Sequence, residues 1–286
     1  MSKFINALGF LTIIKIPNKY ILKREQVANS TVYFPIIGLV IGIILSLFYF
    51  AASSIFPLFI SVILLIGLEV FLSGGAHLDG LGDMFDGTFS GRSDKNKILE
   101  IMKKSDIGVY GILSIVFLLL LKISIVYYIA SIDSGHVLIF YLTIIFMPAF
   151  GRWSMVFLIS RYKNARGSSS LAKIFTDNKN KRKNFYISSI YLFLLFLILY
   201  TFFGYLTGSV VGNFSFLNNS ESVYLILFIL AKALLVTTAL FLLLLPLSWF
   251  FTRRIGGITG DIIGGVSETA ELLFLFINYL VFTFFI

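Results

Sequence analysis

The sequence predicts an all-α integral membrane protein, a polytopic bundle of about seven transmembrane helices. Of its 286 residues, 58% are hydrophobic and 13% are charged, and the mean hydropathy is +0.95. Soluble domains carry about 25% charged residues. The apolar residues also form continuous runs, long enough to cross a hydrocarbon layer of ~30 Å as helices. A membrane barrel would show alternating segments of about ten residues, and these runs do not alternate.

Seven apolar segments fit membrane helices, and six is the fallback count because the last segment is short. No charge occurs between Glu25 and Glu69, and the turn-like stretch SSIFP divides that interval into two spans. The expected spans are Tyr33–Ala52, Pro57–Ser73, Val109–Ala130, Val137–Ser160, Phe185–Gly208, Val223–Phe250 and Thr269–Ile286. We expect a single membrane domain over residues 1–286 and no cleaved signal peptide.

Basic residues are distributed unevenly among the connections between these spans. The connections near Ser53, Asp133 and Asn213 contain no lysine or arginine, whereas the alternate connections are basic. This alternation predicts a cytoplasmic amino terminus. It also places three segments together on the cytoplasmic side, and we expect them to carry the chemistry: residues 74–108, 161–184 and 252–268. Topology thus accounts for the formal charge of +9, and no nucleic-acid partner is expected.

Metal ligands other than oxygen are scarce in this chain. It has no cysteine, and its two histidines are His77 and His136. Disulfides, thiolate metal sites and a cysteine nucleophile are therefore excluded, and a histidine-rich metal site is not expected.

Carboxylates gather in the stretch HLDGLGDMFDG, residues 77–87. If this stretch is helical, at about 100° per residue, Asp83 lies about 40° to one side of Asp79 and Asp86 about 20° to the other. Three ionised carboxylates on so narrow a face repel one another unless a cation lies between them or one is protonated. Oxygen ligands completed by water and substrate phosphates suit Mg²⁺, or alternatively Mn²⁺. The spacing therefore predicts a metal site, although a single aspartate often only caps a helix.

A second acidic stretch, GITGDIIGGVSETAE, precedes the last apolar segment. Its Asp261 and Glu268 are seven residues apart and so lie on nearly the same side of a helix. Asp261 could instead cap that helix, since it precedes an apolar run. Between the two acidic stretches lie donors suited to phosphate oxygens, namely Arg152, Arg161, Lys163, Arg166 and Ser168–Ser170. Metal-binding carboxylates beside basic loops predict phosphoryl chemistry on a diphosphate.

Four motifs follow one another through most of the chain: GGAHLDGLGDMFDG, EIMKKSDIGVYG, ARGSSSLAKIF and GGITGDIIGGVSETAE. Together they resemble the cobalamin synthase family, the adenosylcobinamide-GDP ribazoletransferases. The chain departs from the family pattern at Leu78, where an acidic residue is common, and at Gly82, where alanine is usual. These departures bear on substrate fit more than on the reaction.

The resemblance implies an Mg²⁺-dependent enzyme that joins adenosylcobinamide-GDP to α-ribazole, or to its 5′-phosphate, and releases GMP. It implies that Asp79, Asp83 and Asp86 hold one or two Mg²⁺ ions against the diphosphate. Asp261 would complete the metal site or act as the general base. Asp83, Asp86 and Asp261 are thus the expected catalytic residues.

The resemblance also implies which residues bind substrate. Arg166, together with Lys163 or Lys104, would bind phosphate oxygens. His77 would orient a carboxylate or contact the substrate. The protein would work in membrane lipid, at the cytoplasmic face of a prokaryotic cell membrane, and association into a homo-oligomer is left open.

Two other classes of function are considered beside this one. Membrane transferases of the CDP-alcohol phosphotransferase or prenyltransferase type also use aspartate-rich motifs. The CDP-alcohol pattern has Ala-Arg shortly after its first Asp-Gly, where this chain reads LGDMF. An ion-coupled transporter is a remote alternative and would use Glu69, Lys122 and Lys232 inside apolar runs. Against it, the carboxylates cluster at one boundary and no internal repeat is evident.

Overall fold

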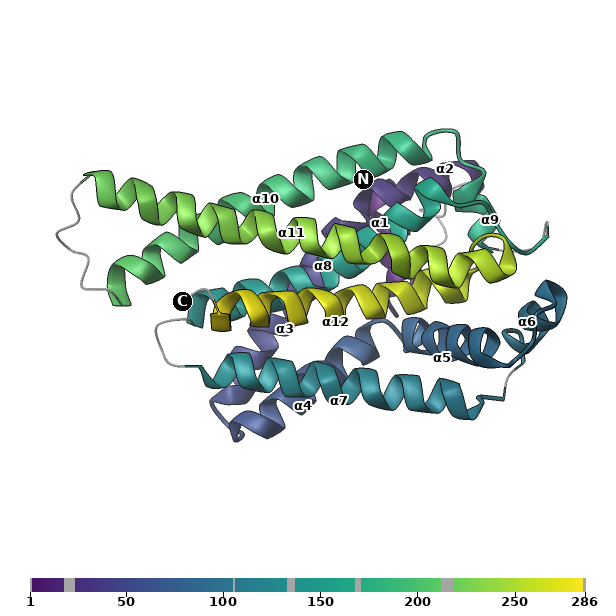
Figure 1. Cartoon of the computed structure of the whole chain (residues 1–286), viewed down its shortest axis with the longest axis horizontal. Coiled ribbons are helices and arrows are strands. Elements are labelled where there is room, and N and C mark those ends of the chain that lie inside the picture. The colour runs from purple at the N-terminus through teal and green to yellow at the C-terminus, as the bar shows by residue number, and fades with distance from the viewer. Residues whose placement is uncertain are drawn as a thin grey trace.

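A computed structural model of the chain describes residues 2–17, 24–104, 106–132, 137–167, 171–211 and 219–284. Within these ranges the chain is helical and has no strand, only a single bridge between Asn164 and Ile258. The predicted all-α class is therefore confirmed. Figure 1 shows the long helices side by side along the longest axis of the molecule. The elements are α1 (Ser2–Leu11), α2 (Arg24–Ala28), η2 (Asn29–Tyr33), α3 (Phe34–Ser53), α4 (Leu58–Leu72), α5 (Ala76–Phe89), α6 (Lys95–Ile101), α7 (Val109–Ser131), α8 (Val137–Arg161), α9 (Leu171–Thr176), α10 (Lys181–Val211), α11 (Asn219–Ile255) and α12 (Gly260–Phe284).

Five helical segments of the described chain are long and apolar enough to cross a membrane, namely Gln26–Ser53, Val109–Ser131, Val137–Arg161, Lys181–Leu206 and Val223–Ile255. A sixth candidate arises if α4 and α5 are taken together as one broken span. The structure thus has five single-helix spans in its described residues, and the fallback count of six is reached only if this bent pair is one span. Residues 269–284 of the expected seventh span belong to α12, which begins at Gly260 and carries Asp261, Glu268 and Glu271, and the last two residues of that span lie outside the described residues. This helix is not among the candidate spans.

Helix α8 lies at the centre of the bundle and is buried along most of its length. It packs against α3, α12 and α10. Its contact with α3 is close because Gly38 and Gly42, four residues apart, present no side chain to it. A Cβ at Gly38 would lie 2.5 Å from the Cα of Ala149. Small residues at this spacing let membrane helices gain dispersion contacts that lipid cannot replace.

A sharp turn separates α4 from α5 and bends the chain by 86°. Gly74 and Gly75 make this turn with φ of 65° and 70°, the left-handed region that glycine enters without strain. Beyond it, α5 packs against α12 and α7. Figure 1 shows α5 and α6 at the same end of the bundle as α9 and the end of α11. The aspartate motif is therefore helical, as predicted, and lies against other helices instead of in a solvated loop.

Gly38→Ala is expected to destabilise the protein by roughly 1–3 kcal/mol, the usual effect of overpacking, because the added methyl group meets the backbone of α8. Gly67→Ala on α4 is the matched control, since a Cβ there meets nothing within 4 Å. That change should stabilise the helix by up to about 1 kcal/mol. Thermal unfolding of the purified variants in detergent measures both effects. Equal melting temperatures for the two variants would contradict the close contact between α3 and α8.

Candidate active site

The candidate site forms where α5 packs against the start of α12. Glycines on both helices permit the contact. A Cβ at Gly80 would lie 2.8 Å from the carbonyl oxygen of Asp261, and one at Gly264 would lie 3.2 Å from the Cα of His77. The two backbones therefore approach closely, and Asp261 comes close enough to Asp83 to influence its ionisation.

The aspartates of α5 repel one another, as the spacing predicts. Asp79 is exposed, whereas Asp83 and Asp86 are half-buried. Helix α5 and the start of α12 lie outside the five single-helix spans. Burial and the negative charges of Asp261, Asp79 and Asp86 raise the pKa of Asp83 to about 7, although Arg166 opposes the shift. Without a compensating cation, Asp83 is thus only partly ionised at neutral pH.

Asp261 lies in the first turn of α12 and faces Arg166. The Nη2 atom of Arg166 is 2.7 Å from its Oδ2. The hydroxyl of Thr259 donates to the same oxygen at 3.2 Å and accepts from the N–H of Ile262 at 3.2 Å. Burial raises the pKa of Asp261, and Arg166 opposes this shift. The alternative in which Asp261 caps the helix is therefore wrong, because Thr259 does so.

Asp86 binds the start of α7. Its Oδ2 accepts the N–H of Gly108 at 2.6 Å, and its Oδ1 accepts the N–H of Gly111 at 2.8 Å. The first N–H groups of a helix have no partner within the helix, and a negative charge is favourable there. Asp86 therefore holds the start of α7 beside α5. Each of its oxygens keeps one further lone pair with which it could bind a metal.

Two loops are joined beside Asp261. The N–H of Ile258 donates to the carbonyl of Lys163 at 2.8 Å, and the N–H of Ala165 donates to the carbonyl of Ile258 at 2.9 Å. Arg166 follows directly and also donates to the carbonyl of Met102 at 3.1 Å. Parts of the three segments that the sequence singles out, 74–108, 161–184 and 252–268, thus meet at one place.

The other expected phosphate-binding residues differ in accessibility. Lys104 and Lys163 are exposed. Arg152 is fully buried in α8 and paired with Glu271, so the expectation that it binds phosphate is wrong. Helix α8 continues to Arg161, which places Arg152 well inside the bundle. Ser168–Ser170 lie outside the described residues.

His77 lies in the interior of the bundle. It is buried, whereas Asp79 is exposed. Its Nδ1 lies 3.9 Å from Oε1 of Glu268. The structure therefore brings His77 to Glu268, and the predicted contact with substrate stays a prediction.

Glu268 belongs to a buried charge cluster that the sequence analysis did not predict. The Nζ atom of Lys122 contacts carboxylate oxygens of Glu69, Glu268 and Glu271, and Arg152 pairs with Glu271. Within the described part of the chain, these three glutamates, and not the aspartates, have carboxylate oxygens that all lie within 4.8 Å of one another. The sequence does show charged residues inside apolar runs, which indicates that such residues need buried partners. It does not show which of them pair with each other.

Comparison with known proteins now identifies the family. Residues 3–279 match the family model for cobalamin-5-phosphate synthase. The chain belongs to this family. A relative from Clostridioides difficile (strain 630), named adenosylcobinamide-GDP ribazoletransferase, is 34% identical over 291 residues and covers 100% of both chains. A relative of the same name from Thermoanaerobacter sp. (strain X514) is 32% identical over 272 residues, which span 95% of this chain and 94% of the relative. No solved structure matches the chain.

Membership of the cobalamin-5-phosphate synthase family confirms the resemblance that the motifs predicted. The match covers nearly the whole chain, so the acidic stretches and the basic loops all fall within it. It favours a transferase over the transporter. The structure also favours the transferase. Glu69 and Lys122, which a transporter would use in an ion path, are buried and ion-paired with each other.

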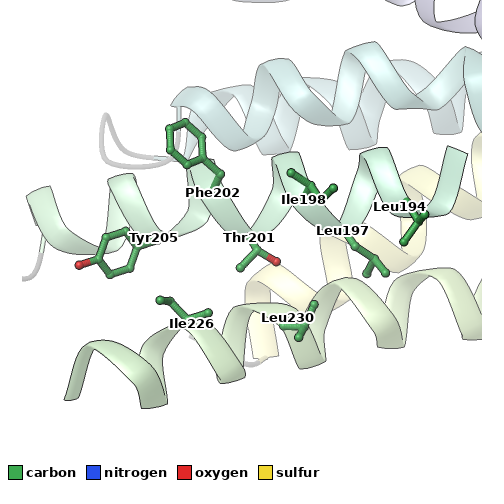
Figure 2. A pocket seen from close by; sticks show the side chains of 8 residues that line it. All are labelled: Leu194, Leu197, Ile198, Thr201, Phe202, Tyr205, Ile226 and Leu230. Atoms are coloured by element: carbon green, nitrogen blue, oxygen red, sulfur yellow. The ribbon is translucent and has the colours of Figure 1, made fainter. Parts of the chain in front are cut away.

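An apolar hollow between α10 and α11 lies apart from the candidate active site. Figure 2 shows its lining, which comes from residues 194–205 and 226–230. Leucine, isoleucine and aromatic side chains dominate, and no charged side chain lines it. It lies toward the end of these helices that is distant from α5 (Figure 1). The hollow therefore lacks the groups that phosphoryl chemistry needs.

Asp86→Ala is expected to destabilise the protein by ~1–3 kcal/mol, because two N–H groups at the start of α7 lose a charged acceptor. Asp79→Ala is the control, since an exposed aspartate should change stability by less than about 0.5 kcal/mol. Thermal unfolding in detergent with EDTA measures both without any contribution from a metal. An Asp86→Ala variant as stable as Asp79→Ala would contradict the role of Asp86 at α7.

Proposed function

We propose that this protein transfers the phosphocobinamide group of adenosylcobinamide-GDP to α-ribazole, or to α-ribazole 5′-phosphate. The products are adenosylcobalamin, or its 5′-phosphate, and GMP, which makes this the last assembly step of the nucleotide loop. The observation that carries the proposal is the meeting of Asp83, Asp261 and Arg166 in a chain that matches this family over residues 3–279. Its relatives carry the name adenosylcobinamide-GDP ribazoletransferase.

The reaction exchanges one phosphorus–oxygen bond for another. A hydroxyl oxygen of α-ribazole attacks the phosphorus that is bonded to the cobinamide arm, and the bond from that phosphorus to GMP breaks. The hydroxyl proton passes to a base, for which we propose Asp261. Thr259 and Arg166 hold this carboxylate in a fixed orientation. Because GMP leaves as an anion, positive charge near the diphosphate stabilises the transition state.

The residues present fit a hard divalent cation. Asp79, Asp83 and Asp261 offer only oxygen ligands, which Mg²⁺ and Mn²⁺ prefer. The raised pKa of Asp83 indicates that its negative charge lacks compensation. Bound Mg²⁺ would neutralise charge on the diphosphate. Asp86 has two of its lone pairs engaged by α7, so we propose that it supports the site chiefly by positioning that helix.

Basic residues complete the proposed substrate site. Arg166 lies beside Asp261 and would bind a phosphate oxygen on the side away from that carboxylate. The exposed Lys104 and Lys163 are attached to the same loops and would reach outward to the substrate. The positive-inside distribution supports a site that faces the cytoplasm in a prokaryotic cell membrane. Assembly into a homo-oligomer stays a prediction.

Asp83→Asn is expected to lower kcat at least 10³-fold, because it removes a charge that stabilises the transition state through the metal. The measurement uses the protein in lipid with adenosylcobinamide-GDP and α-ribazole, and it quantifies cobalamin and GMP together. The wild-type protein should form them in equal amounts with Mg²⁺ and should form neither with EDTA.

Gly82→Ala is the control for the preceding variant, since the added methyl group meets only the ends of the Ile107 and Ile115 side chains. It should retain most of the activity. Near-normal turnover by Asp83→Asn would refute the metal role. Absence of product from folded wild-type protein would refute the substrate assignment, and CDP-alcohols and prenyl diphosphates would be tested next.

Metal affinity is expected to increase with pH. Because the pKa of Asp83 is raised to about 7, this carboxyl is largely protonated at lower pH and ionised at higher pH. A divalent cation binds the ionised form, so affinity should rise up to about tenfold per pH unit below the pKa and then level off. Mn²⁺ binding measured by EPR between pH 6 and 8 tests this without substrate. Asp83→Asn should bind weakly and lose this dependence, and a pH-independent affinity in the wild type would contradict the expectation.

A further inference from the structure

The proposed chemistry makes no use of the buried charge cluster of Glu69, Lys122, Arg152, Glu268 and Glu271. Lys122 is 1% exposed. Its Nζ lies 3.1 Å from Oε1 of Glu69, 2.7 Å from Oε2 of Glu268 and 2.5 Å from Oε2 of Glu271. An ammonium group has three N–H donors, so each donor has its own carboxylate. The ammonium occupies the space among the three carboxylates, which therefore do not act as a separate metal site.

The cluster connects four helices. Glu69 belongs to α4, Lys122 to α7, Arg152 to α8, and Glu268 and Glu271 to α12. Charges buried in this way are a poor source of stability, because well-packed apolar side chains of similar volume often stabilise as much or more. What the cluster does provide is geometric selectivity, since its ion pairs form only when the four helices are in one register.

Two of these helices begin at the candidate site. Helix α7 begins where Gly108 and Gly111 donate to Asp86, and Lys122 lies eleven residues beyond Gly111 (122 − 111). Helix α12 carries Asp261 in its first turn, and Glu271 follows ten residues later (271 − 261). At ~1.5 Å per residue, these separations are about 16 Å and 15 Å along the helices. The cluster and the aspartates are thus joined by the same two helices.

We propose that Lys122 is a positioning residue for the transfer reaction. By binding Glu268 and Glu271 it fixes α12 along α7, and so it sets the position of Asp261 relative to Asp83. The role in catalysis rests on the proposed function, whereas the register of the helices can be measured without turnover. A slip of α12 by one turn, ~5.4 Å, would break the contacts of Lys122 and move Asp261 by the same distance.

The test needs a variant that loses the central donor without gaining buried charge. With His77 neutral, the three glutamates, Lys122 and Arg152 carry a net charge of −1 (three negative and two positive groups). Lys122→Met/Glu268→Gln leaves two negative groups and one positive group, so the net charge stays at −1. Lys232→Met on α11 is the matched control, because that ammonium lies outside the cluster, 4.5 Å from the ring of Phe228.

The first measurement is the distance between the starts of α7 and α12. The chain has no cysteine, so spin labels attach only at introduced sites. Val109→Cys is suitable because Val109 is 70% exposed, and Gly260→Cys because a Cβ there meets nothing within 4 Å. Pulsed EPR should give the same distance for the otherwise wild-type protein and for Lys232→Met. The double variant should show a shift or broadening of about 2–5 Å, up to one helical turn.

The second measurement is the kinetics of the same variants without the labelling sites. The double variant is expected to lose at least tenfold in kcat, since a misplacement of about 1 Å can reduce rates ~10²-fold. Its KM for adenosylcobinamide-GDP should change less than about threefold, because the substrate-binding groups remain present. Loss of stability alone would not produce this split in folded, monodisperse protein.

A folded double variant with the wild-type distance and the wild-type kcat would overturn the proposal. If the double variant does not fold, Glu268→Gln replaces it, since this isosteric change weakens one contact of Lys122 with α12 and leaves Glu271 paired with Arg152. An unchanged distance and kcat in that variant would overturn the proposal as well. If the wild-type protein releases no GMP, the proposed function fails, and the distance comparison alone decides the role of Lys122.

Discussion

The close approach of α5 and α12 is the constraint on which the candidate site depends. Gly80 lies against the backbone of Asp261, and Gly264 lies against the backbone of His77. Any side chain at these glycines would separate the helices and weaken the influence of Asp261 on Asp83. Because α12 also packs against the buried α8, these carboxylates are held in place relative to the centre of the bundle.

The carboxylates on α12 and beside it on α5 fall into two groups with different surroundings. Glu268 and Glu271 are buried, and their charges are compensated by Lys122 and Arg152. Buried charges require such partners, since an unpaired one costs several kcal/mol. Asp261 has Arg166 as a partner, but the neighbouring Asp83 is surrounded mainly by other carboxylates. The buried cluster keeps its charges enclosed in the bundle. Asp83 and Asp261 are only partly buried, so water, a cation and a polar substrate can reach them.

Periodicity and composition predicted the helices and the shared aspartate face, because both depend on residues close together in the chain. The partners of those residues could not be predicted in the same way. Asp86 binds N–H groups of Gly108 and Gly111, more than twenty positions away, and Lys122 binds a glutamate from the far end of the chain. The Gly74–Gly75 turn shows the same limit. Two glycines predict that the chain can turn, but packing against α12 and α7 determines its direction.

The surroundings of the aspartates also bear on how a large substrate could bind. Gly75 and Gly260 border open space, since a Cβ at either would meet nothing within 4 Å, and Asp79 nearby is exposed. A corrinoid is far larger than the diphosphate that must react. If the corrinoid stays outside the bundle, only the diphosphate arm has to reach Asp83 and Asp261. Two features of the site then have separate roles. The packed helices position the carboxylates, and the glycines leave room for the substrate.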